Sequence, residues 1–538
     1  MKNLSASSAA LRGVGSVAAL LCGFFFIGQA WAGDLARGEA CIAAADLSCA
    51  RAAAVGLGAT AREQGFLADL SFHEQRFDDA LRLLKASAGP TPDASTQNGL
   101  DLYKATVEAV AGFVSETRGD VTVMYLPGTD EVLLDDTFTT LQAAHDRIGP
   151  KLGGAPPGGV RVEIYPTAAR FIAASGIPAE SVQTTGVVAL SKWSRLLLTS
   201  PRALARGYAW KDTLAHEYIH YVVAYNSADK APVWLQEGIA RSHEVLWRRD
   251  DFAELPAYQQ SLLADALSHG SLVPLERMHP SMAFLPSAEM ASLAFAQVAT
   301  MMEFLANTTG PDAARRVLLK VKGNTDALAA VADIGAKGDA GAFMTGWKDW
   351  LKTLRLVSRK LAAMPTVIGE GDDLATDPLL AKRRDLAGFV RLGDLLFEVE
   401  KSKAALVEYQ KAVPDEDEPA SPALAVRLAR AHHSLGDDAR AMLILRASLV
   451  DYPEYASSHK ELAQQLQRHG KTEEATSEYL SSADINPFDP DVQSALATLY
   501  GASGNAPEAA RRRRYERILR LGGSPPPDPH AGPPEKTP

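Results

Sequence analysis

Residues 214–220 read LAHEYIH, and residues 234–240 read WLQEGIA, so each stretch sets polar side chains among apolar ones. In the first stretch, Glu217 stands directly after His216, and His220 follows four residues after that histidine. Residues four apart share one face of an α-helix, so both imidazoles can point at one position. Zinc accepts imidazole nitrogen and carboxylate oxygen, and a catalytic zinc keeps one position for water. The first stretch therefore predicts a metal site with two histidine ligands.

Two glutamates complete this prediction. Glu217 is turned from the histidine pair by one residue, so its carboxylate can reach a water at the metal without being a ligand. That is the position of a general base. The third ligand is expected from Glu237, which lies in an apolar helix where a carboxylate is costly unless a cation compensates its lost hydration. The alternative for the first stretch alone is a helix with two exposed histidines. The apolar residues of segment 213–223 favour a buried helix instead.

A mixture of strands and helices surrounds the two stretches. Alternating β-branched runs predict strands at residues 120–128, 159–166 and 194–201, with a helix at 135–154 between the first two. Helical patterns follow at 211–226, 233–248 and 290–307, and the unit closes near 343–356. Strands first and helices after them favour an α+β unit.

A repeat of 34 residues appears near the C-terminus. Its fixed positions are Gly436, Gly470 and Gly504, then Ala441, Ala475 and Ala509 five residues later, with Pro453 and Pro487 at the same interval. Small residues at fixed offsets in this period are typical of tetratricopeptide repeats, in which the glycine makes the turn and the alanine lets two helices approach. An earlier repeat is indicated by Gly393, Ala405, Tyr409 and Ala412.

The N-terminus predicts export. Lys2 and Arg12 precede the apolar run 15–30, and Ala30-Trp31-Ala32 forms a small-x-small cleavage site. This is the layout of a secretory signal peptide, with a retained N-terminal anchor as the alternative. Downstream, the sequence has no other uninterrupted apolar run near twenty residues, so no stable membrane span is expected after cleavage. In an oxidising compartment Cys41 and Cys49 could form a disulfide, and the alternative is two small buried apolar residues.

The composition is globular with an acidic excess. Of the 538 residues, 46% are hydrophobic and 22% are charged, and the formal net charge is −10. Nucleic-acid binding would need a basic face that neutralises phosphates, so the composition argues against it. The basic run Arg511–Arg514 lies late in a helical pattern and is predicted to be a solvated helix face.

Taken together, His216, Glu217, His220 and WLQEGIA resemble the zincin peptidases whose third zinc ligand is a glutamate, the gluzincins. More narrowly, they resemble the peptidase MA-like domain family, with its HExxH and Pro-x-Trp-Leu-x-Glu-Gly stretches, and the second stretch is similar to one in zinc aminopeptidases. The likeness covers about residues 118–355. It implies that His216, His220 and Glu237 bind one Zn²⁺ per chain and that Glu217 is catalytic. It also implies a bacterial enzyme, periplasmic or secreted, with repeats attached to the peptidase domain.

The chain departs from these relatives in two places. Sixteen residues separate His220 from Glu237, a little fewer than in zinc aminopeptidases. Relatives often have a tyrosine, which could stabilise the oxyanion, where this chain has Phe295 in Ala294-Phe295-Ala296-Gln297. Possible substitutes are Tyr258, His269 and His279. Glu244 falls on the same helix face as Glu237, where it is either solvent-exposed or holds a ligand histidine.

Six segments are therefore expected along the chain. They are a signal peptide (1–32), a helical segment resembling one repeat hairpin (33–98), the peptidase MA-like zinc domain (99–360), a linker (361–386), the tetratricopeptide repeats (387–521) and a disordered Pro-rich tail (522–538). The expected fold class is an α+β zincin-like peptidase domain followed by an all-α solenoid, with a short helical N-terminal segment.

Three functions stay open on the sequence. The first is an exported zinc metallopeptidase whose repeats recruit a peptide or protein substrate or a protein partner. The second is a catalytically weak or inactive peptidase-like scaffold that acts through its repeats. The third is another zinc hydrolysis, for example of a cell-wall peptide cross-link. An endopeptidase is favoured over an aminopeptidase, because no acidic motif for a substrate's free amine is evident. The natural substrate and the oligomeric state are not indicated.

Overall fold

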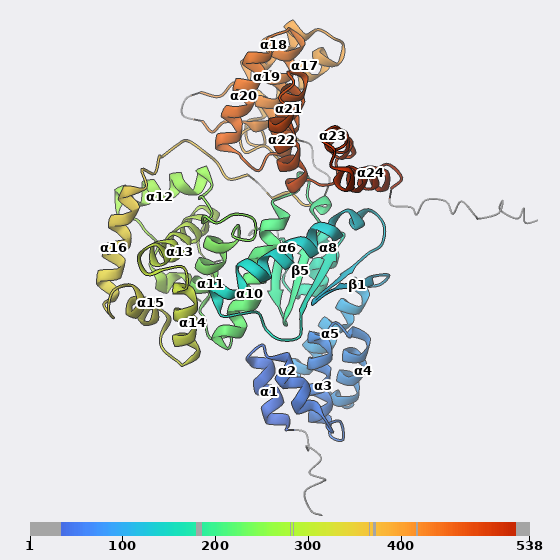
Figure 1. Ribbon diagram of the computed structural model, residues 1–538, viewed down its shortest axis with the longest axis vertical. Coiled ribbons are helices and arrows are strands. Elements are labelled where there is room, and N and C mark those ends of the chain that lie inside the picture. Colours follow the sequence, from blue (N-terminus) through green and yellow to red (C-terminus); the bar gives the residue numbers. More distant parts are fainter. Residues whose placement is uncertain are drawn as a thin grey trace, which may run out of the picture.

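The computed structural model describes residues 34–178, 186–279, 281–282, 285–364, 366–369, 373–415 and 418–522. The expected signal peptide and all but the first residue of the expected tail lie outside these residues. The described chain is mostly helical and contains one small mixed sheet. In Figure 1 the N-terminal helices and the repeats lie at opposite ends of the long axis, with the sheet between them. None of the helices in the described ranges is long and apolar enough to cross a membrane.

Five helices form the N-terminal part. They are α1 (Leu35–Ala43), α2 (Leu47–Ala54), α3 (Ala61–His73), α4 (Phe77–Ala88) and α5 (Ala94–Ala109). Asp34 and Asp46 cap the first two helices by accepting hydrogen bonds from backbone N–H groups, and Thr60 and Glu63 form a capping box on the third. The expected boundary between residues 98 and 99 falls inside α5, so this helix carries the chain from the N-terminal part toward the sheet.

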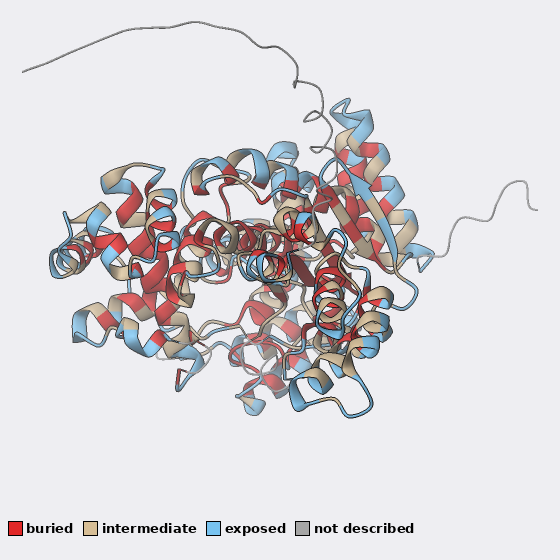
Figure 2. Cartoon of the chain, turned by 90° about the horizontal axis from the view of Figure 1, so that it is seen from below, coloured by how far each residue is buried: buried red, intermediate tan, exposed pale blue. Residues whose placement is uncertain are grey.

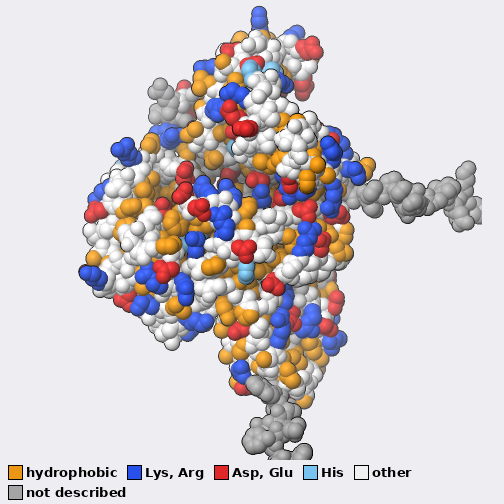
Figure 3. All heavy atoms as spheres, viewed as in Figure 1, with side chains coloured by type: hydrophobic (Ala, Val, Ile, Leu, Met, Phe, Trp, Pro, Cys, Tyr) orange, Lys and Arg blue, Asp and Glu red, His pale blue; other side chains and the backbone are white. Residues whose placement is uncertain are grey.

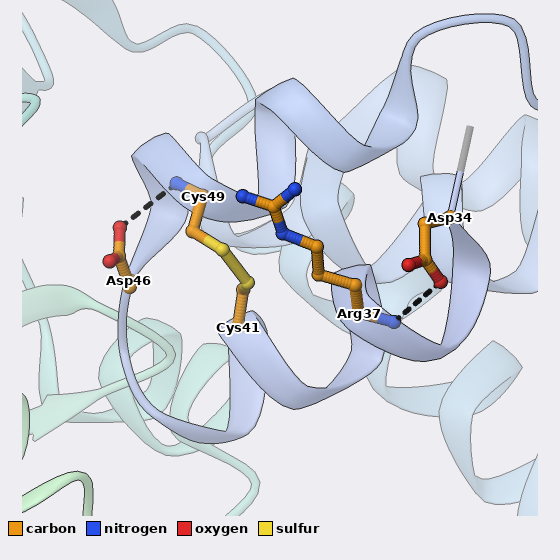
Figure 4. Close-up of a disulfide and its surroundings, with 5 residues drawn as sticks. All are labelled: Asp34, Arg37, Cys41, Asp46 and Cys49. Atoms are coloured by element: carbon orange, nitrogen blue, oxygen red, sulfur yellow. Dashed lines mark hydrogen bonds between the residues drawn. A yellow bond between two sulfur atoms is a disulfide. The ribbon is translucent and has the colours of Figure 1, made fainter. Parts of the chain in front are cut away.

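Cys41 in α1 and Cys49 in α2 are joined by a disulfide (Figure 4). Their Cα atoms lie 5.6 Å apart, because the chain turns between the two helices. Of the two alternatives for these cysteines, the structure therefore has the covalent one. The bond closes the hairpin of α1 and α2. Together with α3 these helices have only a small apolar core, around Phe66 and Leu70.

The sheet has five strands in the order β1-β2-β3-β5-β4. They are β1 (Val114–Arg118), β2 (Val121–Tyr125), β3 (Val160–Tyr165), β4 (Ala189–Lys192) and β5 (Arg195–Thr199). The three inner strands are parallel and correspond to the strands expected from the sequence, while both edge strands are antiparallel. Strand β4, at one edge, pairs Ser191 with Leu196 of β5. This edge is the part of the sheet that matters for the candidate site.

Helices cover the sheet and bury its apolar side chains. The covering helices are α6 (Leu134–Arg147), α7 (Gly149–Leu152), α8 (Ala168–Ser175) and α10 (Trp210–Ser227), with short 3₁₀ turns η1 (Thr129–Leu133) and η2 (Pro201–Ala203). The strand residues Val123, Val162 and Ile164 pack with Trp210 and Tyr218 of α10 in the main core. Figure 2 shows this buried band continuing through the middle of the molecule. Because α10 is anchored along its length, the residues on its free face are held in fixed positions.

A second group of helices packs beside α10. It comprises α11 (Val233–His243), α12 (Ala257–His269), η3 (Leu275–Met278), α13 (Ala288–Thr309), α14 (Ala313–Lys322), α15 (Ala327–Gly335) and α16 (Ala340–Thr353). Helix α11 begins after Pro232 and runs between α10 and α13. Gly238 permits the close approach to α13, because a Cβ there would lie 2.7 Å from the carbonyl oxygen of Val298.

Eight helices form the C-terminal repeats. They are α17 (Arg384–Glu398), α18 (Ser402–Lys411), α19 (Pro422–Ser434), α20 (Asp438–Asp451), α21 (Ala456–Arg468), α22 (Thr472–Ile485), α23 (Pro490–Ala502) and α24 (Ala506–Arg520). Each pair forms a hairpin. The three glycines spaced by the repeat have φ of +83°, +71° and +80° in the turns, as L-residues rarely do. The matching alanines, Ala441, Ala475 and Ala509, are buried between the paired helices.

The repeats dock onto the body that contains the sheet. The amide of Tyr208, just before α10, donates to the carbonyl oxygen of Ile485 at the end of α22, with an N–O distance of 3.1 Å. Lys211 forms an ion pair with Asp484 of the same helix. Arg511 of α24 pairs with Asp136 of α6 at 2.9 Å. The repeats are therefore fixed against the elements that lead into α10.

Candidate metal centre

Two imidazoles and one carboxylate meet where α10 passes α11. The Nε2 atoms of His216 and His220 are 3.0 Å apart. The carboxylate of Glu237 lies beside both, with Oε2 3.4 Å from Nε2 of His216 and Oε1 3.5 Å from Nε2 of His220. The ligand atoms of this trio all lie within 4.8 Å of one another. The structure thus brings together the three residues that the sequence proposes as ligands.

The three distances fit a zinc ion. Bonds of about 2.0–2.1 Å in tetrahedral directions place ligand atoms about 3.3 Å apart. The three separations between the donor atoms here, 3.0, 3.4 and 3.5 Å, lie on both sides of that value. Two imidazole nitrogens and one carboxylate oxygen are also a donor set that zinc accepts, with one tetrahedral position left for water or substrate.

Glu244 orients one of the candidate ligands. Its Oε2 lies 2.9 Å from Nδ1 of His216, and its side chain is only 17% exposed. A carboxylate on Nδ1 directs the lone pair of Nε2 toward the other two donors. The alternative that Glu244 is simply solvent-exposed is wrong, because about two helix turns after Glu237 its carboxylate contacts His216 of α10.

The charges of the cluster favour a bound cation. Burial opposes a charge on His216, but hydrogen bonds to Glu237 and Glu244 outweigh it and raise the pKa of His216 to about 9. Burial lowers the pKa of His220 to about 4, so this imidazole is neutral at pH 7 and can donate a lone pair. The excess of carboxylates around one protonatable imidazole is the electrostatic setting that a divalent ion would neutralise.

Glu217 faces the edge strand β4. Its carboxylate is buried, and its pKa is raised to about 7. Burial is the largest cause of this rise, His216 acts to lower the pKa, and Glu237 acts to raise it. The backbone of Ser191 in β4 lies close to this carboxylate and acts to lower its pKa. A carboxyl group with a pKa near neutrality can accept and return a proton in the same catalytic cycle. The edge of the sheet, the candidate base and the candidate metal ligands are therefore contiguous.

The sequence-proposed substitutes for a missing tyrosine are not in this cluster. Phe295 of α13 packs against the main core and offers no hydroxyl. His269 is exposed at the end of α12, with its Nδ1 bonded to the carbonyl oxygen of Asp265. His279 lines a surface cavity of about 620 Å³ that includes none of the three candidate ligands. For Tyr258, the described residues show no contact with the trio.

Two residues near the cluster were missed by reading the sequence. Arg241 stands one turn after Glu237, and its guanidinium lies 5.3 Å from the ring centroid of Phe295. Tyr208 donates a hydrogen bond to the carbonyl oxygen of Thr199 at 2.5 Å, and Glu217 is close enough to raise its pKa beyond the effect of burial. The spacing of four residues from Glu237 could have placed Arg241 on the same helix face, but it does not indicate the contact with Phe295 of α13. Nothing in the local sequence could have indicated Tyr208.

Comparisons with known proteins were made for the whole chain. No family model matches it, and no curated protein matches it. Among solved structures, native yeast LTA4 hydrolase is 11% identical with a TM-score of 0.29, covering 76% of this chain and 66% of that one. The crystal structure of MamA is 16% identical with a TM-score of 0.23, covering 26% of this chain and 81% of that one. Similarity at these scores carries no argument about the activity of this chain.

Proposed function

We propose that the chain is an exported, zinc-dependent metallopeptidase of the gluzincin type. The observation that carries the proposal is the convergence of two imidazole nitrogens, from His216 and His220, and the carboxylate of Glu237 at separations that fit one tetrahedral ion. Glu217, buried beside them with a pKa near 7, supports hydrolysis as the reaction. Weak similarity to a yeast hydrolase is not needed for this proposal.

The residues of the cluster have distinct roles in it. His216, His220 and Glu237 would hold the zinc ion, and Glu244 would keep the ring of His216 in register. When bound, zinc supplies Lewis acidity that polarises the scissile carbonyl and makes water more acidic. Glu217 takes a proton from the attacking water and delivers it to the leaving amine.

The edge of β4 offers a place for the substrate. Strand β4 is the last strand of the sheet, so one side of its backbone is not paired with another described strand. An extended peptide can add to such an edge through main-chain hydrogen bonds. Because the backbone of Ser191 in β4 lies close to Glu217, a peptide on this edge would pass the candidate base. We propose an endopeptidase on this basis, since an edge strand does not require a chain end.

Location and partners follow from other parts of the chain. The Cys41–Cys49 disulfide supports an oxidising compartment, so we propose a periplasmic or secreted bacterial protein. The helical hairpins of residues 384–520 support recruitment of a protein substrate or partner. Figure 3 shows acidic and basic side chains interspersed over the visible face. This distribution argues against nucleic-acid binding by that face, which would need a basic patch.

A second candidate function is a peptidase-like scaffold that binds zinc or peptide without useful turnover. The observation that favours it is Phe295, which occupies a position where relatives often have a hydroxyl. In this alternative the repeats perform the function and the metal stabilises the body.

Metal analysis separates these candidates from a protein without a metal site. Purified protein should contain about one zinc per chain, and His216→Ala should lose it. His269→Ala, which removes an exposed histidine from the end of α12, is the matched control and should keep it. If zinc content were the same in both variants, the ligand assignment would be wrong.

A paired peptide digest then tests catalysis. Wild-type protein and Glu217→Gln are incubated with a peptide mixture, and the products are identified by mass spectrometry. We expect cleavage by the wild type, and loss of at least about 100-fold in rate for Glu217→Gln with zinc content unchanged. Glu276→Gln on η3 is the control for removing a carboxylate. Equal cleavage by wild type and Glu217→Gln would exclude Glu217 as the base, and cleavage by neither would favour the scaffold.

A further inference from the structure

Arg241 brings a positive charge to the candidate metal centre. It lies in α11 four residues after Glu237, so the two side chains share one helix face. Its guanidinium stacks over Phe295, with 5.3 Å between the central carbon and the ring centroid. The face of the aromatic ring attracts the guanidinium, because the ring quadrupole is negative there. Phe295, which offers no hydroxyl, thus contacts the guanidinium of Arg241 in this chain.

The hydrogen-bonding capacity of Arg241 is mostly unused. Its one ion pair is a long contact of 3.5 Å between Nη1 and Oε2 of Glu244, and that oxygen is already 2.9 Å from His216. Nε is buried without a hydrogen-bond partner among the described residues. The side chain as a whole is 41% exposed. A guanidinium has five N–H donors, so most of them remain available at an open position beside the metal centre.

The surroundings keep Arg241 charged. Arg241 lies within the electrostatic reach of Glu244, Glu237, Glu454 and Glu217, and these carboxylates raise its pKa against the effect of burial. Glu454 belongs to the turn between α20 and α21 and is exposed. No ion pair within 4.0 Å joins Glu454 to Arg241 in the described chain.

We infer that Arg241 binds a carboxylate of the substrate, and that the enzyme prefers peptides with an acidic group close to the scissile bond. This inference rests on the proposed peptidase function and adds a substrate class to it. A carboxylate matches the planar fork of a guanidinium and accepts two N–H bonds at once. A stacked guanidinium loses little further freedom when it binds, so the contact is pre-organised.

The carboxylate could come from two sources. An Asp or Glu side chain near the cleavage site would make Arg241 a determinant of sequence preference. The terminal carboxylate of a short peptide would make it a recogniser of chain ends. The chemistry at Arg241 is the same in both cases, so the substrates in the experiment have to separate them.

Peptide binding provides the first test, because it does not depend on turnover. Zinc-loaded Glu217→Gln protein is titrated with fluorescent peptides that differ only in one residue, Glu or Gln, and in a free or amidated C-terminus. We expect the best acidic peptide to bind about 10- to 100-fold more tightly than the neutral amidated one, the range of a charged hydrogen-bonded pair. Adding Arg241→Gln should abolish the difference, while Arg241→Lys should keep part of it.

A matched charge removal makes the result specific. Arg315→Gln, on the exposed side of α14, removes the same charge at a remote site and should leave the preference intact. Zinc content and circular dichroism show that each variant is folded and loaded. Equal binding of acidic and neutral peptides by the Glu217→Gln protein, or an unchanged preference in the Arg241→Gln background, would overturn the inference.

Turnover distinguishes this inference from the proposed function. In wild-type protein the acidic preference should appear in kcat/KM, and Arg241→Gln should lower kcat/KM for acidic peptides while sparing neutral ones. Cleavage of neutral and acidic peptides at equal rates would overturn the inference and leave the peptidase proposal standing. If no peptide is cleaved but acidic peptides bind through Arg241, the peptidase proposal fails and the carboxylate site remains.

Discussion

Glu163 of β3 and Arg195 of β5 form a fully buried ion pair on the sheet, where the N-terminal helices pack against it. The Nη1–Oε1 distance is 2.6 Å, and both side chains have no exposed surface. Arg195 also lies over the rings of Phe72 and Phe77, 4.4 and 4.7 Å from their centroids. Removing one partner of such a pair leaves an uncompensated buried charge, which costs about 3–5 kcal/mol. The attachment of the N-terminal part therefore depends on a few polar residues in a dry contact.

His73 at the end of α3 lies beside this pair and makes the stability depend on pH. Burial, followed by the charge of Arg195, lowers the pKa of His73 to about 3 in the folded chain. The unfolded chain binds a proton near pH 6.5 and the folded chain does not, so acid favours unfolding. We expect the free energy of unfolding to fall by up to about 1.4 kcal/mol per pH unit below pH 6.5 through this group, until the folded pKa is reached. Urea titrations at pH 7, 6 and 5 measure the slope.

Variants assign this slope to one side chain. His73→Gln should reduce the slope of the pH dependence by the contribution of this one group, because its amide does not titrate, while buried His220 and His243 keep theirs. His269→Gln on α12 changes an exposed histidine and should leave the curve as in the wild type. An unchanged slope in His73→Gln would place the responsible group elsewhere.

Among the candidate site residues, those whose geometry is local could be predicted. His216, Glu217 and His220 share one helix, so their spacing alone defines their arrangement. Glu244 stayed open because its contact with His216 depends on how α10 and α11 cross, which no local pattern encodes. Arg241 was missed for the same reason, since its stacking partner Phe295 lies on a third helix.

The crossing of α11 and α13 positions Glu237 against α10. Gly238 stands at the contact, where a Cβ would lie 2.7 Å from the carbonyl oxygen of Val298 and 3.0 Å from Cγ of Met302. A backbone oxygen cannot move aside as a flexible side chain would. The position of a candidate metal ligand is thus set by the absence of a side chain on the next residue.

Gly238→Ala is therefore expected to separate the two helices. The overlap should cost about 1–3 kcal/mol of stability and shift Glu237, so that zinc affinity falls as well. Thermal unfolding and competition with a chromophoric chelator measure the two effects. Gly388→Ala, a helical glycine in α17 with open space around its Cβ position, is the control and should be neutral or stabilising. Unchanged zinc affinity in Gly238→Ala would contradict the role given to this crossing.

The elements that sequence reasoning missed have weak local signals. β1 reads VSETR and is largely exposed, so its residues show no apolar alternation. β4 has only four residues, and its last two, Ser191 and Lys192, are polar. Residues 179–185, shortly before it, lie outside the described residues. Strands β2 and β3 were predictable because buried apolar side chains alternate along them, and β5 because its apolar run is buried throughout.

At the scale of the molecule, the repeats and the body meet through backbone as well as side chains. Gly207 has φ of +70°, and a Cβ there would lie 2.2 Å from the carbonyl oxygen of Ile485. The neighbouring Tyr208 both donates its amide to Ile485 and lies close to Glu217. The docked repeats are therefore connected to the candidate base through one residue.

Gly207→Ala should undock the repeats. It adds a backbone collision, worth about 1–3 kcal/mol, to the strain of a left-handed residue. We expect faster cleavage of the linker by an added protease and a larger radius of gyration in solution scattering. Gly270→Ala is the matched control, because its φ is +67° and nothing surrounds its Cβ position. Equal behaviour of the two variants would show that strain alone, and not docking, is responsible.

The prediction that Arg511–Arg514 form a solvated face was wrong for its first two members. Arg511 pairs with Asp136, a residue 375 positions earlier in the chain, and Arg512 is buried with its Nη1 bonded to Gln493. A contact at that separation leaves no trace in the local pattern. The repeat itself was predictable because each hairpin packs mainly on its neighbours.

The return of α24 to the start of the body has a consequence for how the protein is made. Tyr515 is part of the main core, and its hydroxyl donates to Asp135 at 3.1 Å. A ribosome releases the sheet and both histidines long before it releases this last hairpin. Until then, Asp135 has its ion pair with Arg118 but lacks Tyr515, Asp136 lacks Arg511, and one side of the core is exposed to water. A chain cut short by a premature stop codon before α24 would thus contain every proposed ligand but leave the part of the core around Tyr515 uncovered. We expect quality-control proteases to degrade such a chain.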